Sequence, residues 1–203
     1  SKNSDLYIHH RDYALSVDRY KPTLGRHEYL LDLSREDIQN YLIHMLDSYL
    51  STGLIDYIKW DMNRPMTDVC SYISQYSTEV AHRYMLGLYR VLDVITSRYP
   101  DVLFEGCSSG GARFDPGILC YMPQTWASDN TYALDRSVIQ DGFSLLYPQS
   151  VIGAHISAVP NHQTGRITSL ETRYDIAKLF NLGYELDLTK CTDDELDDIK
   201  KQI

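Results

Sequence analysis

The sequence lacks several of the patterns that most often reveal a function. Its four cysteines form no CxxC pair, which argues against a zinc ribbon, a redox motif or a disulfide framework. No apolar run approaches the ~18–20 residues that a membrane-spanning helix needs. No GxGxxG turn follows the first predicted strand, and no HxH or HExxH spacing indicates a metal site. We therefore expect a cytoplasmic protein that uses neither a metal nor a cofactor.

Positive charge is also scarce. The chain has 19 Lys and Arg against 28 Asp and Glu, a net charge of −9, so nucleic acid and anionic membranes are poor partners for it. Its first residues, SKNSDLYIHH, include neither a starting Met nor the pattern of a signal peptide. We therefore expect a segment of a longer protein, and the sequence leaves the export of that protein open.

What the sequence does contain is a regular alternation of strand and helix patterns. Short apolar runs predict strands at 28–34, 54–61, 101–109, 124–130, 150–160 and 182–188. Helical periodicity follows each of them, and Ser34, Thr168 with Glu171, and Thr192 with Glu195 are expected to cap helices. Six strand–helix units in series predict a parallel sheet with helical crossovers.

Two architectures fit that alternation, a doubly wound open sheet and a (β/α)8 barrel. Polar residues favour the barrel, because five of them lie at or just past the C-terminal ends of different predicted strands, where barrels gather their catalytic groups: Asp32, Asp61, Cys107, Asp129 and His155. The fold prediction is an α/β (β/α)8 TIM barrel that is incomplete, with about six βα units and the first two strands missing. Residues 1–203 are expected to form a single partial domain.

The segment DYIKWDMNRP (56–65) places two charges within a predicted strand. Lys59 and Asp61 share one strand face, while Ile58 and Trp60 point to the other. One interpretation is a salt-bridged pair that fills the barrel interior. The other is a functional site, because burying a carboxylate is costly and functional sites tolerate that cost.

Asp129, in WASDNTYALDR, also has two interpretations. It could cap the helix that follows it. Alternatively, Asp129 and Asp61 could face each other across a sugar ring, one attacking and the other transferring a proton, as paired carboxylates do in glycosidases.

Other polar residues are weaker candidates. CSSGGARFD (107–115) has two glycines where a ligand could approach the backbone, and its Cys107 is expected to line a pocket rather than to act as a nucleophile. A metal site formed by His155 and His162 with Asp32 and Asp61 is disfavoured by their spacing.

Four segments resemble a known family. YIKWDMNRP, CSSGGARFD, WASDNT and GAHISAVPNHQTGR are similar, in the same order and over essentially the whole chain, to the signature blocks of the microbial α-galactosidases of glycoside hydrolase family thirty-six. The resemblance implies a retaining exo-glycosidase that removes terminal α-linked galactose from melibiose, raffinose and related oligosaccharides. By match to the blocks, Asp61 would be the nucleophile and Asp129 the acid/base.

The same resemblance implies a set of substrate-binding residues. Lys59, Cys107 and Gly110 match positions that contact galactose, Trp126 supports the pocket, and Arg64 belongs to the same set. Tyr132 departs from the family block SDNTDA, in which an Asp stands at its position.

The resemblance also implies features outside this chain. The family's N-terminal β-sandwich, the first barrel strands with their acidic pair, and the C-terminal β domain are absent. The parent is expected to be a bacterial homo-oligomer, a tetramer, acting on galactoside oligosaccharides. Two other functions stay open: galactosyl transfer, as in plant raffinose synthases, and an inactive carbohydrate-binding fragment.

Overall fold

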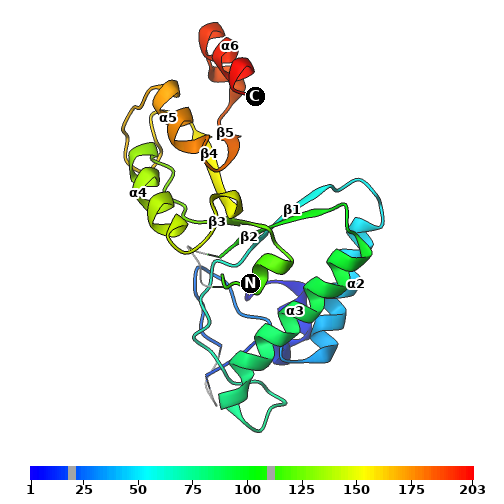
Figure 1. Ribbon diagram of the computed structural model, residues 1–203. Helices are drawn as coiled ribbons and strands as arrows, with labels where there is room; N and C mark the ends of the chain where they lie inside the picture. The colour runs from blue at the N-terminus through cyan, green and yellow to red at the C-terminus, as the bar shows by residue number, and fades with distance from the viewer. Residues whose placement is uncertain (18–21, 109–112) are drawn as a thin grey trace. The chain divides into compact units, whose positions relative to one another are not determined.

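The computed structural model describes residues 1–17, 22–108 and 113–203. The chain divides into two compact units, Ser1–Pro123 and Gln124–Ile203. In each unit parallel strands alternate with helices (Figure 1). The expected single domain over residues 1–203 stays a prediction. None of the helices in the described part of the chain has the length and apolar character that a membrane crossing requires.

The first unit is built on two parallel strands and two long helices. The strands are β1 (Tyr57–Asp61) and β2 (Leu103–Cys107), and the long helices are α2 (Glu36–Leu50) and α3 (Val80–Arg98). Short helical segments complete the unit: α1 (Asp5–His9), η1 (Arg11–Tyr13), η2 (Ser77–Glu79) and η3 (Ile118–Cys120).

The core of the first unit lies between the two long helices and the strands. Figure 1 shows α2 and α3 side by side. Each helix buries an apolar face of helical spacing, as amphipathic helices do. The buried side chains include Ile38, Leu42, Leu46 and Leu50 of α2 and Tyr84, Leu88, Val91 and Ile95 of α3. These residues share one hydrophobic cluster with Phe104 of β2.

The two faces of β1 differ as the sequence predicts. Ile58 and Trp60 pack against the hydrophobic cluster. Lys59 and Asp61, which alternate with them, are more exposed and point to the opposite face. The predicted alternation of these four side chains between the two faces of β1 is confirmed.

The second unit contains the remaining strands and helices. Its strands are β3 (Gln124–Trp126), β4 (Ile152–Ser157) and β5 (Asn181–Glu185), and β4 pairs in parallel with both of the others. Its helices are α4 (Ala133–Ser144), α5 (Leu170–Ala177) and α6 (Asp193–Gln202), with short segments η4 (Gln149–Val151) and η5 (Leu188–Lys190). A small cluster of Ala154, Ile156 and Ala177 forms a core between β4 and α5.

The predicted strand at 28–34 is wrong. In that segment Glu28 and Leu31 make only isolated bridges, to Gly25 and Ala14. Leu33 is buried in the core, and its carbonyl accepts a hydrogen bond from the Gln39 side chain at 2.8 Å. The backbone of this run also pairs with the segment at 13–15, through Leu15 N to Leu30 O and Asp32 N to Tyr13 O. The apolar run is therefore a core-packing loop rather than a strand of the parallel sheet.

The incomplete barrel is confirmed, but with fewer strands than expected. The described residues contain five strands rather than the six that were predicted. A complete barrel has eight strands, so the described residues lack three of them rather than two. The five strands are also shorter than their apolar runs, because the flanking residues pass into loops.

Helix capping is predicted only in part. The N-cap of α2 is Arg35, not Ser34, and it makes no side-chain capping bond. Ser169, rather than Thr168, caps α5. The capping box of Thr192 and Glu195 at the start of α6 is confirmed.

Candidate active site

The C-terminal ends of β1 and β2 bring three predicted site residues together. The parallel register sets Lys59 opposite Glu105 and Asp61 opposite Cys107. Because paired residues of a parallel sheet share a face, Lys59, Asp61 and Cys107 lie on one side of this strand pair. Cys107 is buried, whereas the Asp61 side chain is exposed.

The Asp61 carboxylate is held by a chain of two side chains. The Asn63 amide donates to Asp61 Oδ2, and Arg26 Nη1 donates to Asn63 Oδ1 at 2.8 Å. Arg26 and His27 have φ values of 48° and 65°, the left-handed region that residues other than glycine seldom adopt. Such strain is often found at functional sites. Neither Arg26 nor Asn63 was among the predicted site residues, although Asn63 lies inside the segment DYIKWDMNRP.

Lys59 is paired across the strands. Its Nζ lies 3.2 Å from Oε1 of Glu105, a residue that is only 1% exposed. The Tyr57 hydroxyl donates to the other carboxylate oxygen of Glu105. Glu105 is not recognisable as a site residue from the sequence, because its contact with Lys59 depends on the register of two strands that are far apart in sequence.

A buried arginine joins the two strand ends. Arg113 Nη2 donates to the carbonyl oxygens of Trp60 and Cys107, at 2.8 and 3.4 Å. Its guanidinium also lies 5.7 Å from the centre of the Trp60 ring. Burial lowers the pKa of Arg113, and the neighbouring Tyr84 and Asp61 groups oppose that shift. Arg113 therefore ties the end of β1, next to Asp61, to the end of β2.

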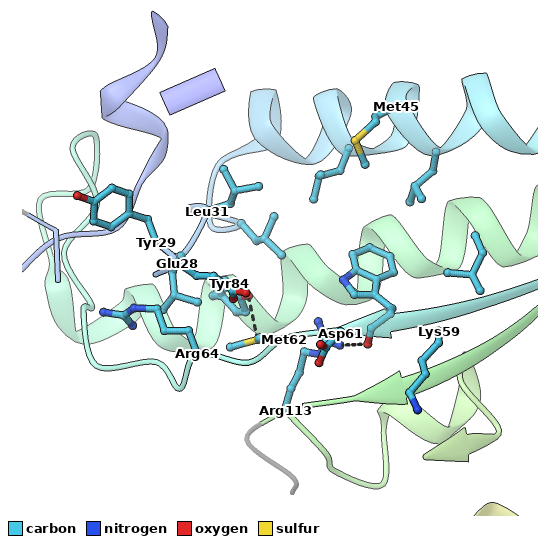
Figure 2. Close-up of a pocket in the computed structure, with 16 residues that line it drawn as sticks. Glu28, Tyr29, Leu31, Met45, Lys59, Asp61, Met62, Arg64, Tyr84 and Arg113 are labelled. Carbon is cyan, nitrogen blue, oxygen red and sulfur yellow. Dashed lines mark hydrogen bonds between the residues drawn. The ribbon is translucent and has the colours of Figure 1, made fainter. Parts of the chain in front are cut away.

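A cavity opens beside the end of β1. Its volume is about 380 Å³, and its walls include Lys59, Asp61 and Arg113 together with Met45 of α2 (Figure 2). Figure 2 shows Lys59 pointing to the side of β1 away from α2. Most of the other residues that line the cavity are apolar, among them Leu42 and Trp60.

In the second unit, Asp129 is the third residue after β3. Its carboxylate is exposed and accepts a hydrogen bond from Trp126 Nε1 at 3.2 Å. The N-cap of α4 is Tyr132. The interpretation of Asp129 as that helix's cap is therefore wrong, and its carboxylate is available for other chemistry.

Trp126 is in turn held by a buried arginine. The Arg136 guanidinium lies 4.6 Å from the centre of the Trp126 ring. It donates to the carbonyl oxygens of Ser128 and Gly153, at 3.0 and 2.6 Å. Burial lowers the pKa of Arg136 to about 10. This contact fixes the ring whose N–H orients Asp129.

Tyr132, which stands where the family block has an Asp, packs its ring against an arginine. The Arg166 guanidinium lies 5.1 Å from the centre of its ring. Tyr132 makes no capping bond with its side chain at the start of α4. The ring thus supports an arginine from the loop after β4.

Arg64, another predicted substrate-binding residue, lines the same cavity but is engaged with the protein. Arg64 is buried and donates to the Thr23 carbonyl, and its guanidinium is 3.1 Å from Asp68. These contacts hold the loop after β1. The predicted contact of Arg64 with substrate stays a prediction. Gly110 lies outside the described residues.

Two of the five polar residues that favoured the barrel are not at strand ends. His155 is in the middle of β4, 4.5 Å from the Trp126 ring, because β4 extends to Ser157. Asp32 lies in the loop that was predicted to be a strand. Within the described ranges, no cluster of three His, Cys, Asp or Glu could hold a metal ion.

The fold and these groups define a class of protein. Parallel strands alternating with helices, with carboxylates placed at or just after the strand ends, are typical of (β/α)-barrel enzymes. A comparison with family models matches residues 1–203 to the family described as Melibiase. The chain belongs to this family.

Relatives and solved structures agree with that assignment. The chain is 54% identical to "Alpha-galactosidase AgaA" of Geobacillus stearothermophilus, covering 100% of this chain and 28% of that protein. A crystal structure of an AgaA variant in complex with raffinose matches with a TM-score of 0.94 over the same shares of the two chains. The α-galactosidase of Lactobacillus brevis matches with 48% identity and a TM-score of 0.94, again over 100% of this chain and 28% of that one. This chain thus spans just over a quarter of the length of these relatives.

Proposed function

We propose that this chain is the catalytic-barrel segment of a retaining α-galactosidase. The observation that carries the proposal is the position of Asp61, at the end of β1 on the same face as Lys59 and Cys107. The substrates would be oligosaccharides with a terminal α-linked galactose, of the melibiose and raffinose type. The raffinose complex of AgaA supports this choice of substrate.

The reaction would proceed in two displacements. Asp61 attacks the anomeric carbon while Asp129 protonates the departing glycosidic oxygen, which leaves a galactosyl ester on Asp61. Asp129 then removes a proton from water, and that water releases galactose from Asp61 with net retention of configuration. Retention requires the two carboxyl groups to lie ~5–5.5 Å apart, which a structure of the full-length protein can measure.

The geometry around each carboxylate supports its role. Asp61 is exposed but oriented by Asn63, as a nucleophile must be. Asp129 accepts a hydrogen bond from Trp126 and otherwise faces solvent, where a proton can be exchanged with a leaving group and with water.

The test is substitution of each carboxylate in the full-length protein. Asp61→Ala should lower kcat for an aryl α-galactoside by at least about 10³-fold, because the covalent step is lost. Asp129→Ala should impair raffinose more than an aryl substrate whose leaving group needs no proton. NMR of the first product should show α-galactose.

Asp141→Ala is the matched control, since Asp141 is an exposed carboxylate on α4 and should not affect hydrolysis. Retained activity in Asp61→Ala would overturn the assignment of the nucleophile. Transfer of galactose to sucrose in preference to water would instead identify a galactosyltransferase.

A further inference from the structure

Glu105 is a buried carboxylate that the mechanism above does not use. It lies in the middle of β2 and is only 1% exposed. A charge in such a place is costly unless it is paired and hydrogen-bonded. A neutral side chain of similar volume would avoid that cost, so the contacts of Glu105 indicate what it does.

Both carboxylate oxygens of Glu105 face β1. Oε1 lies 3.2 Å from the Lys59 ammonium, and Oε2 accepts a hydrogen bond from the Tyr57 hydroxyl. Glu105 and Lys59 are direct partners in the strand register. The side chain of Lys59 remains 36% exposed, so its ammonium is anchored on one side and open on another.

This arrangement restricts a flexible side chain. A lysine has four rotatable side-chain bonds, and fixing them when a ligand binds costs conformational entropy. An ion pair that already fixes the ammonium removes part of that cost before the ligand arrives. The ammonium has three N–H donors. It can therefore stay within ion-pair distance of Glu105 and still donate to a ligand.

We propose that Glu105 is a positioning residue for the substrate: its buried carboxylate holds the Lys59 ammonium in place to donate to the sugar hydroxyls beside Asp61. The inference rests on the proposed function, in which Lys59 contacts galactose. Glu105 acts through Lys59 and does not itself touch the sugar.

The first test is Glu105→Gln in the full-length protein. Glutamine keeps the volume and an oxygen acceptor for Tyr57 but removes the charge that holds Lys59. We expect KM for an aryl α-galactoside and the Kd for galactose to rise about 10- to 100-fold, the usual worth of a hydrogen bond to a charged group, with a smaller change in kcat. Glu105→Asp, which keeps the charge with a shorter reach, should recover part of that loss. Tyr57→Phe, which leaves the ion pair in place, should change KM much less.

The second test is a double-mutant cycle with Lys59→Met. If Glu105 acts through Lys59, Glu105→Gln should add little to the rise in KM that Lys59→Met causes alone. Effects that multiply would overturn the proposal, as would an unchanged KM in Glu105→Gln. Failure of Glu105→Gln to fold, with normal galactose binding by a folded Lys59→Met, would also overturn it, because Glu105 would then support only the fold.

The same measurements separate this inference from the proposed function. A wild-type protein that neither hydrolyses the aryl α-galactoside nor binds galactose would refute both. An active wild type with Asp61→Ala inactive and Glu105→Gln unchanged would refute the role of Glu105 alone.

Discussion

The orientation of Asp61 depends on a single amide. Asn63 uses its nitrogen to bond Asp61 and its oxygen to accept from Arg26. With both ends engaged, the amide has one orientation, and the carboxylate that it contacts is restricted with it. A nucleophile restricted in this way loses less freedom when the reaction begins.

At this scale we predict that Asn63→Ala lowers kcat about 10- to 100-fold while the melting temperature of the full-length protein changes little. The loss would reflect one hydrogen bond to a charged group. Steady-state kinetics with an aryl α-galactoside measures it.

Asn40→Ala is the control for that substitution. Asn40 also accepts a hydrogen bond from an arginine, Arg90, at 2.9 Å, but it lies on α2 away from the strand ends. An equal loss of activity in both variants would contradict an orienting role for Asn63.

At the scale of elements, the packing of α3 depends on a missing side chain. A Cβ added at Gly87 would lie 1.8 Å from the carbonyl oxygen of Leu33, far inside van der Waals contact. The loop at 28–34 therefore packs directly against the helix backbone. Because of this close contact, apolar residues at 28–34 are buried in the core although they do not form a strand.

We predict that Gly87→Ala destabilises the protein by about 1–3 kcal/mol, because the loop or the helix must shift to admit a methyl group. Gly142→Ala on α4 should instead stabilise the protein. No atom lies within 4 Å of a Cβ at Gly142, so alanine there adds only helix propensity, about 0.5–1 kcal/mol. Thermal unfolding should show a lower melting temperature for Gly87→Ala and a higher one for Gly142→Ala. Equal shifts in the two variants would refute the close contact between Gly87 and Leu33.

At the scale of the whole chain, the two units differ in how much apolar surface they bury. The cluster of the first unit extends over both long helices, both strands and the loop at 28–34. The cluster between β4 and α5 in the second unit has Ala154, Ile156 and Ala177 at its centre, with partly buried side chains around it. Burial of apolar surface is the main stabilising term in folding.

We therefore predict unequal stability in the 203-residue chain on its own. Amide hydrogen exchange should be at least about 10-fold slower in α2 and α3 than in α4 and α5, because local opening costs less where fewer apolar contacts break. Mass spectrometry of peptic fragments can measure this. Equal protection in both units would indicate that the chain unfolds as one domain. The expected tetramer and the cytoplasmic location stay predictions for the full-length protein.

Local patterns in the sequence were sufficient for much of this structure. Alternation of apolar runs with helical periodicity predicted the α/β class, because both patterns follow from the geometry of a few consecutive residues. The same short-range rule placed Lys59 and Asp61 on one face of β1 and Thr192 with Glu195 at a helix start. These features depend on neighbours two to four residues apart.

Tertiary structure decided what lies between distant segments. The run at 28–34 has the composition of a strand, but its position against Gly87 makes it a core loop. Likewise, Glu105 meets Lys59 only through the register of β1 and β2, and Arg26 meets Asn63 only through a strained turn. The sequence by itself determined which elements form and which strand carries the charges. Only the fold decided which side chains those charges meet, because register and packing bring together residues that no local pattern relates.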